Sequence, residues 1–247
     1  MTPVVGSRLD SVSLAEAIER IRAWALARES RYVCVANVHA VMAAHDSIEI
    51  RRVMNDADLV VPDGMPLVWM LRLKGHAGQE RVYGPALMER MLEEASRNRL
   101  PIGLYGSTPD VLSALHGRIL SENPGASIAF EESPPFEKVS GAADAALCER
   151  IASSGTRILF VGLGCPKQER WMAAHRDKVP CVMIGVGAAF DFLAGKKRQA
   201  PRWMQNTGLE WLFRLATEPG RLWRRYLHHN PRFVVLAAAE LLHRRSP

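Results

Sequence analysis

Residues 158–171 read ILFVGLGCPKQERW, and this stretch decides the fold. Its apolar run over 158–161 has no polar alternation, which is typical of a strand covered on both faces. A glycine turn follows. Pro166 then suits the first turn of a helix, because the N–H that proline lacks would have no partner there. The stretch predicts a strand, a tight turn and a helix, the unit from which parallel α/β sheets are built.

The same pattern recurs on both sides of this stretch. Glycine or aspartate turns lead to a proline at 63–66 and 106–109, and Tyr83-Gly84-Pro85 opens a further helix. Further unbroken apolar runs predict strands at 32–36, 59–61, 102–105, 128–130 and 181–186. We therefore expect an α/β body over residues 1–195, with a mostly parallel sheet and helices on both of its faces.

Charge divides the chain into two unlike parts. The net charge of the 247 residues is +6, but residues 196–247 hold 11 Lys or Arg against three Asp or Glu, a net of +8. Residues 1–195 hold 21 Lys or Arg against 23 Asp or Glu, a net charge of −2. The last fifth of the chain is thus a basic appendage, which favours an anionic partner.

The appendage, residues 196–247, is predicted to be helical. An apolar and aromatic helix is expected near 209–216, followed by a break at Pro219-Gly220. The next helix places Arg221, Arg224 and Arg225 on one face, because their spacings are three and four residues. Pro231 is expected to end that helix, and 233–242 to form a last apolar one. The appendage also holds Trp203, Trp211 and Trp223.

Composition excludes several classes of protein. A hydrophobic content of 48% and a charged content of 23% argue against disorder, collagen and coiled coil. Cys34, Cys148, Cys165 and Cys181 form no CxxC pair, so neither a zinc site nor a disulfide framework is indicated, and a reducing compartment fits best. The chain lacks the pattern of a secretion signal and any stretch of the roughly 20 apolar residues that a membrane span needs.

The predicted turns would gather at the carboxyl ends of the strands, where open α/β sheets bind ligands. Helix N-termini at this edge offer unpaired N–H groups and a positive dipole end, so a phosphate-bearing ligand is indicated. The alternative is that these glycines and prolines only form the turns between strands and helices and bind no ligand.

Two of these strand ends carry candidate chemistry. Asp63 follows the strand at 59–61, where its carboxylate can serve as a general base, although an Asp-Gly pair is more often only a turn. Asn37 follows the strand at 32–36 and can bind a sugar or phosphate, or be a satisfied loop amide. His39 can bind phosphate or exchange protons, but a lone histidine is more often structural.

Other motifs narrow the ligand class. The turn at 162–164 begins like a dinucleotide fingerprint but lacks the third glycine, which disfavours a nicotinamide dehydrogenase. Gln168 and Glu169 fall in a first helical turn, and Asp191 can bind ribose or cap a helix. Asp56-Ala57-Asp58 looks like a metal-binding acidic pair, but it precedes its strand and would lie at the opposite edge from Asp63. No metal site and no cofactor are therefore predicted.

Four motifs in order resemble the WecG/TagA/CpsF glycosyltransferase family, over roughly residues 30–235. They are ADLVVPDG at 57–64, GLGCPKQE at 162–169, GVGAAFD at 185–191 and GLEWLFRL at 208–215. The resemblance implies a Rossmann-like core with an appendage that engages the membrane and a lipid diphosphate. It also implies an inverting, metal-independent transfer from a UDP-sugar to a polyprenyl-diphosphate-linked saccharide, for cell-surface polysaccharide synthesis at the inner face of the cytoplasmic membrane.

The resemblance also implies residue roles. Asp63 matches the proposed catalytic base of the family, and Asn37, Gln168, Asp191, Arg214, Arg221 and Arg224 match its substrate-binding positions. We add Glu169 and the backbone at Gly64, Gly106, Gly164 and Gly187. Many members have a threonine where this chain has Val35. The transferred sugar is not fixed, since members use N-acetylmannosamine, its uronic acid or glucose.

Two other functions stay open at this point. The first is a non-catalytic regulatory protein that binds a UDP-sugar without turning it over. The second is a nucleic-acid-binding protein that uses the basic tail, which the slightly acidic body and the predicted pocket loops disfavour. The sequence also leaves open whether the chain forms a homo-oligomer.

Overall fold

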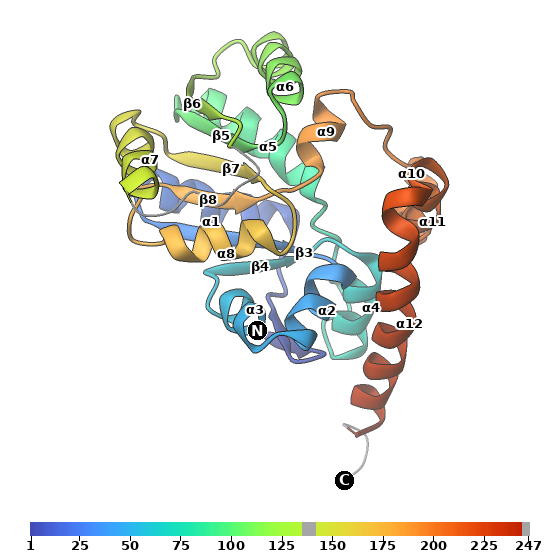
Figure 1. Cartoon of the computed structure of the whole chain (residues 1–247). Helices are drawn as coiled ribbons and strands as arrows, with labels where there is room; N and C mark the ends of the chain where they lie inside the picture. Colours follow the sequence, from blue (N-terminus) through green and yellow to red (C-terminus); the bar gives the residue numbers. More distant parts are fainter. Residues whose placement is uncertain (135–141, 244–247) are drawn as a thin grey trace.

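A six-stranded parallel sheet forms the centre of the protein (Figure 1). The structure, a computed structural model, describes residues 1–134 and 142–243. The strand order is β4-β3-β8-β7-β5-β6, and every neighbouring pair is parallel. The strands are β3 (Arg31–Ala36), β4 (Leu59–Pro62), β5 (Ile102–Gly106), β6 (Ile128–Glu132), β7 (Ile158–Gly162) and β8 (Val182–Gly185). All six predicted apolar runs are strands, so the predicted fold class is confirmed.

Helices cover both faces of the sheet, because successive side chains of each strand point to opposite sides. Val33 and Val35 join one apolar core, whereas Tyr32 and Cys34 join the other. The first core is covered by α1 (Leu14–Leu26), α5 (Gly84–Arg97), α6 (Pro109–Glu122) and α9 (Ala189–Leu193). The second is covered by α2 (Val38–Asp46), α3 (Ile48–Asn55), α4 (Met65–Leu73), α7 (Ala142–Ser153) and α8 (Lys167–His175).

Local sequence explains where the helices begin. Ser13 and Glu16 form a capping box at the start of α1, with the Ser13 N–H donating to Glu16 Oε2 at 2.7 Å. Prolines stand in the first turns of α4, α5 and α6, as the sequence predicted. Gly106 has φ +125°, and a Cβ there would lie 2.6 Å from the carbonyl carbon of Gly162, so only glycine lets β5 and β7 approach this closely.

An antiparallel hairpin of β1 (Thr2–Val4) and β2 (Ser7–Leu9) precedes the sheet and was not predicted. Its strands have three residues each, too few to show a period-two pattern. Val4 and Leu9 are buried in the second core, so the hairpin extends the body rather than trailing from it.

Three helices form the described part of the appendage: α10 (Arg202–Asn206), α11 (Glu210–Thr217) and α12 (Pro219–His243). The predicted apolar helix is confirmed, but the chain is interrupted at Glu218 rather than at Pro219-Gly220, which form the start of α12. The predicted end at Pro231 is wrong, because α12 continues through this residue. Leu222 before the proline and Phe233 after it are both buried, so packing on each side holds the helix together despite the lost hydrogen bond. Residues 244–247 lie outside the described part of the chain.

Helix α12 lies along the body rather than apart from it (Figure 1). It contacts α2, where Arg232 Nη2 and Nη1 donate to the two carboxylate oxygens of Asp46 at 2.6 and 2.9 Å. Further along, Glu240 accepts from the Val5 N–H at 2.7 Å and pairs with Lys74. None of the described helices combines the length and apolar character needed to cross a bilayer.

Phe233→Ala is expected to lower the free energy of unfolding by about 3–5 kcal/mol, the usual cost of emptying a buried aromatic site. Phe233 is only 3% exposed and belongs to the core between α2 and α12. Urea denaturation measures the change, with exposed Val234 on the same helix replaced by alanine as the control. A loss below 1 kcal/mol, near that of the control, would mean that the appendage is only loosely attached.

Candidate active site

Asp63 and Asn37 lie side by side at the carboxyl edge of the sheet. Each follows the last residue of its strand, and Pro62 is paired with Ala36 in the β3–β4 register. The Asp63 N–H donates to the Ala36 carbonyl at 2.7 Å. A Cβ on Gly64 would lie 3.7 Å from Asn37 Cα, so Gly64 also borders this corner. The two predicted strand-end residues are therefore brought together.

Arg81 holds the Asp63 carboxylate in place. Its Nη2 donates to Asp63 Oδ1 at 2.9 Å, and its Nε donates to the Asp63 backbone carbonyl. The same Nη2 donates to Glu210 Oε2 at 2.7 Å, which brings a carboxylate from α11 into the site. The guanidinium lies 4.1 Å from the ring centroid of Tyr83. The side chains of Asp63, Arg81 and Glu210 are 17%, 15% and 14% exposed.

The surroundings make Asp63 more basic than an ordinary carboxylate. Burial raises its pKa most, and the negative charge of Glu210 raises it further. Arg81 and Arg214 lower the pKa, but the net direction is upward. Oδ1 is bound to Arg81, whereas Oδ2 accepts no hydrogen bond from any described residue. Asp63 thus has one carboxylate oxygen that no described residue binds, and a pKa above the ordinary value.

Asn37 has a structural task of its own. It is the N-cap of α2, and its Oδ1 accepts from the Ala40 N–H at 3.2 Å. The alternative that Asn37 is a hydrogen-bonded loop amide is therefore correct for its Oδ1 atom. Within the described residues, nothing accepts a hydrogen bond from Asn37 Nδ2.

Gln168 joins the β7–α8 loop to the end of β8 at the carboxyl edge of the sheet. Its Oε1 accepts from the Gly164 N–H at 3.2 Å, and its Nε2 donates to the Gly185 carbonyl at 3.1 Å and to Glu169 at 3.0 Å. A Cβ on Gly187 would lie 3.3 Å from Gln168 Oε1. Gln168 is buried and its amide is fully used, so it acts here as a brace between the β7–α8 loop and the end of β8.

Glu169 is buried beside this brace. Burial raises the pKa of its carboxyl group, and its Oε2 is buried without a hydrogen-bond partner. Gly106 lies at the end of β5, next to β7, and so borders the same edge without contacting Asp63. The predicted residues thus form two groups, one around Asp63 and one around Gln168.

Asp191 belongs to a chain of ion pairs. Lys197 Nζ lies 3.1 Å from Asp191 Oδ2 and 3.3 Å from Glu218 Oε2, and Arg221 Nη2 lies 2.5 Å from the same Glu218 oxygen. This network links α9 to the junction of α11 and α12. Asp191 lies inside α9, whose N-cap is Ala188, so it is not a helix cap. Its carboxylate is paired with Lys197, and its role as a ribose ligand stays a prediction.

The predicted arginines differ in setting. Arg214 lies with its guanidinium 5.5 Å from the Phe192 ring centroid, and its Nε is buried without a partner. Arg224 is exposed and lies 5.2 Å from the ring centroid of Trp223. Arg225 was expected on the same helix face as Arg221 and Arg224. Those two side chains are exposed, whereas Arg225 is half-buried and its Nε lacks a hydrogen-bond partner.

Arg225 faces two histidines between α2 and α12. The rings of His39 and His229 lie 4.9 Å apart, and both Nδ1 atoms are buried without partners. Burial, followed by the positive charges of Arg225 and His229, lowers the pKa of His39 to about 4. The cluster brings the Arg225 guanidinium and two imidazoles together, and the nearby carboxylate of Asp46 is bound by Arg232.

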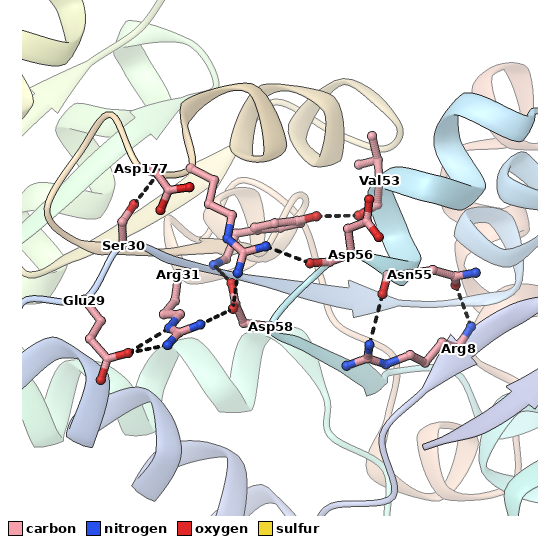
Figure 2. A network of polar contacts seen from close by, with 11 residues as sticks. Arg8, Glu29, Ser30, Arg31, Val53, Asn55, Asp56, Asp58 and Asp177 are labelled. Carbon is pink, nitrogen blue, oxygen red and sulfur yellow. Dashed lines mark hydrogen bonds and ion pairs between the residues drawn. The ribbon is translucent and has the colours of Figure 1, made fainter.

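Asp56 and Asp58 lie at the amino edge of the sheet, as predicted (Figure 2). Arg31 Nη1 and Arg176 Nη2 donate to Asp58 Oδ1 at 2.7 and 2.8 Å, and the Tyr32 N–H donates to Oδ2 at 3.0 Å. Asp58 is thus occupied by two arginines. The acidic pair serves the structure of this edge, far from Asp63.

Two groups of side chains in the described residues have spacings compatible with a metal ion, although the sequence showed none. They are Asp46 with His228 and His229, and Asp144 with Cys148 and His175. Arg232 donates to Asp46 and contacts His228 at 2.9 Å, so a cation already occupies the first group. His175 ends α8, which starts at the ligand edge and runs away from it, so the second group is remote from Asp63.

Sequence reasoning missed Arg81, Tyr83 and Glu210 as site residues. Arg81 and Tyr83 stand in a connection without strand or helix pattern, just before the Gly84-Pro85 signal. Glu210 was quoted within its motif, but nothing in the sequence showed that its partner would be Arg81. Glycine at 84 is a further missed feature, because a Cβ there would lie 3.4 Å from Val35 Cγ1 and 3.7 Å from Asp63 Oδ2.

Comparison with known proteins decides the family. The model of the glycosyl transferase WecG/TagA/CpsF family matches residues 2–247. The chain belongs to this family. It is therefore a glycosyltransferase, and the resemblance that its four motifs predicted is confirmed.

Curated relatives of this WecG/TagA/CpsF family member are named N-acetylglucosaminyldiphosphoundecaprenol N-acetyl-β-D-mannosaminyltransferases. The Bacillus subtilis (strain 168) protein is 31% identical over 197 residues, which cover 79% of this chain and 74% of the relative. The Bacillus spizizenii protein is 31% identical over 216 residues, covering 87% of this chain and 80% of the relative. Their names describe transfer of N-acetylmannosamine to a lipid-diphosphate-linked sugar.

Proposed function

We propose that this glycosyltransferase moves a sugar of the hexose or N-acetylhexosamine class from a UDP-sugar to a polyprenyl-diphosphate-linked saccharide, with inversion at the anomeric carbon. The curated relatives support an N-acetylmannosaminyl group and an N-acetylglucosamine-bearing acceptor as the first choice. The product would enter cell-surface polysaccharide synthesis at the inner face of the cytoplasmic membrane.

In this proposal Asp63 is the general base. Its Oδ2 takes the proton of the acceptor hydroxyl, while the acceptor oxygen forms a bond to the anomeric carbon. The bond from that carbon to the donor diphosphate breaks on the opposite face, and its electron pair leaves with UDP. The raised pKa of Asp63 supports this role, because a carboxylate of higher pKa accepts a proton more readily.

One observation supports a diphosphate ligand most strongly. Buried nitrogens of Arg214, Arg225, His39 and His229 lack hydrogen-bond partners, and the helices that bear them lie over the same edge of the sheet as Asp63. Buried polar groups are almost always paired in folded proteins, so the unpaired nitrogens, two of them on the cationic side chains of Arg214 and Arg225, support an anion that binds there. The positive charge of the arginines would stabilise the departing diphosphate.

The proposed transfer needs no metal ion. The acidic pair at 56–58 lies at the far edge, and the carboxylate of Asp58 is held by Arg31 and Arg176. Asp63 is likewise held by Arg81, and Asp191 by Lys197, so the carboxylates of the site are paired with protein cations. Side-chain cations and helix dipoles would then do the work that a bound metal does in other transferases.

Calorimetric titration with UDP and UDP-N-acetylmannosamine tests this proposal, with EDTA in one series and Mg²⁺ or Mn²⁺ in the other. We expect equal affinity in both series. Binding that requires the metal would overturn metal independence. Absence of UDP binding in both series, together with tight and salt-sensitive binding of an oligonucleotide, would instead support the nucleic-acid alternative.

The appendage is proposed to hold the enzyme at an anionic membrane. Its outer side exposes several large apolar side chains next to basic ones; they are Trp203, Trp211, Leu212, Trp223 and Leu227. Tryptophan favours the bilayer interface, and each nearby Lys or Arg adds about 1 kcal/mol of attraction to anionic lipids.

Replacing both Trp223 and Leu227 with serine is expected to weaken binding to phosphatidylglycerol vesicles at least about tenfold, since one buried apolar side chain contributes about 1.5–3 kcal/mol. Vesicle sedimentation measures the change. Ile48→Ser is the matched control, because Ile48 is 69% exposed on α3 of the body. Equal binding of the double variant and the control would show that this surface does not contact lipid.

A further inference from the structure

The appendage contributes a carboxylate to the immediate surroundings of Asp63. We propose that Glu210 is a positioning residue for sugar transfer: through Arg81 it holds Asp63 ready to accept the acceptor proton, so that transfer requires α11 in its docked place. This inference rests on the proposed role of Asp63 as the base. It adds a catalytic task to the appendage that differs from membrane or diphosphate binding.

The geometry makes Arg81 a shared partner. Its Nη2 donates to Asp63 Oδ1 at 2.9 Å and to Glu210 Oε2 at 2.7 Å. The face of the guanidinium is fixed by the Tyr83 ring at 4.1 Å. Arg81 also donates to the Asp63 backbone carbonyl, which fixes the orientation of the carboxylate. In this orientation Oδ1 accepts from Arg81, and Oδ2 accepts no hydrogen bond from a described residue. Without Glu210, one anchor of the guanidinium is lost.

The charges around Asp63 also indicate that Glu210 acts on it through Arg81. The described groups that face Asp63 are Arg81 and Tyr83 from the connection before α5, and Glu210 and Arg214 from α11. Arg81 is shared between the carboxylates of Asp63 and Glu210, so it does not neutralise Asp63 alone, and Arg214 supplies the second positive charge near the base. Removing Glu210 would give Arg81 to Asp63 alone and would lower the pKa of the base.

Glu210 reaches this place because the start of α11 is seated on the body. Gly208, with φ +75°, packs its turn so closely on α4 that a Cβ there would lie 2.8 Å from Trp69 Cη2. Helix α4 begins directly after Asp63-Gly64. The first turns of α4 and α11 therefore converge on Asp63, and undocking the appendage would remove Glu210 from Arg81.

The test is the pH profile of kcat for Glu210→Gln, with UDP-N-acetylmannosamine and N-acetylglucosaminyl-diphospho-undecaprenol as substrates. We expect kcat to fall about tenfold, because a weaker base gives a slower proton transfer. The acidic limb of the profile should move to lower pH, while KM for the donor stays unchanged. Glu210→Asp keeps the charge, so its acidic limb should stay close to that of the unmodified protein, with a smaller fall in kcat.

Glu122→Gln is the matched control, because it removes the same charge from an exposed ion pair with Arg118 on α6. If Asp63→Asn is inactive but Glu210→Gln keeps the unmodified rate and acidic limb, the role of Glu210 is wrong and that of Asp63 stands. If Asp63→Asn stays active, the base itself is wrong. An acidic limb shifted equally in the Gln and Asp variants would overturn the charge argument. If Glu210→Gln does not fold, Glu210→Asp alone is the test, and a shifted acidic limb in that variant would overturn the proposal.

Discussion

Asp63→Asn should lower kcat for sugar transfer about 10²–10⁴-fold, the range that a positioned general base contributes. Asparagine keeps an oxygen that can accept from Arg81, but it cannot take up the acceptor proton. The affinity for UDP should be unchanged, because Asp63 faces the acceptor side of the reaction in this account. Initial rates with the lipid-linked acceptor and calorimetry with UDP separate the two effects.

The matched control is Asp110→Asn, an exposed aspartate in the first turn of α6 that lies at the same edge of the sheet. It makes the same chemical change without touching the site, so its kcat should equal that of the unmodified protein. Turnover of Asp63→Asn near the control value would remove Asp63 as the base. A loss of UDP binding in the same variant would instead assign Asp63 to the donor.

Arg214→Ala is expected to lower kcat about 10²–10³-fold, the usual effect of removing one preorganised donor that stabilises transition-state charge. Arg214 lies on the Phe192 ring with a buried, unpartnered Nε, and its positive charge is felt at Asp63. Its charge is thus close enough to the base to act on a diphosphate bound beside it. Stopped assays at saturating donor and acceptor measure the loss in kcat.

Two further variants show whether charge or shape matters at this position. Arg214→Lys keeps the charge but loses the fork that binds two oxygens, so its activity should lie between those of Arg214→Ala and the unmodified protein. Arg202→Ala removes an exposed arginine from α10 and should leave kcat unchanged. If Arg214→Ala and Arg202→Ala have equal activity, Arg214 does not act on the leaving group.

The sheet could be predicted because burial on both faces leaves unbroken apolar runs in the sequence. All six strands and the strand-end position of Asp63 follow from this pattern. The hairpin β1–β2 was not predicted, because strands of three residues are too short to show an alternating pattern. Pro231 misled the prediction because local proline chemistry favours a break, whereas the packing of Leu222 and Phe233 on the body keeps α12 whole.

The site was predictable only in part. Motifs identified Asp63, Asn37 and Gln168, but their partners come from distant segments. Arg81 and Glu210 are 129 positions apart in the chain, and no local pattern announces such a pair. The sequence also could not show that both ends of the Gln168 amide bind other parts of the protein, since those contacts exist only in the folded chain.

The proposed reaction is inverting, metal-independent transfer to a lipid-linked diphosphate with Asp63 as the base. The most direct test is to incubate the protein, in EDTA, with UDP-N-acetylmannosamine and N-acetylglucosaminyl-diphospho-undecaprenol, and to determine the anomeric configuration of the product by NMR. We predict a β-linked disaccharide from the α-linked donor, and none with Asp63→Asn. An α-linked product, or product only after Mg²⁺ or Mn²⁺ is added, would contradict the account.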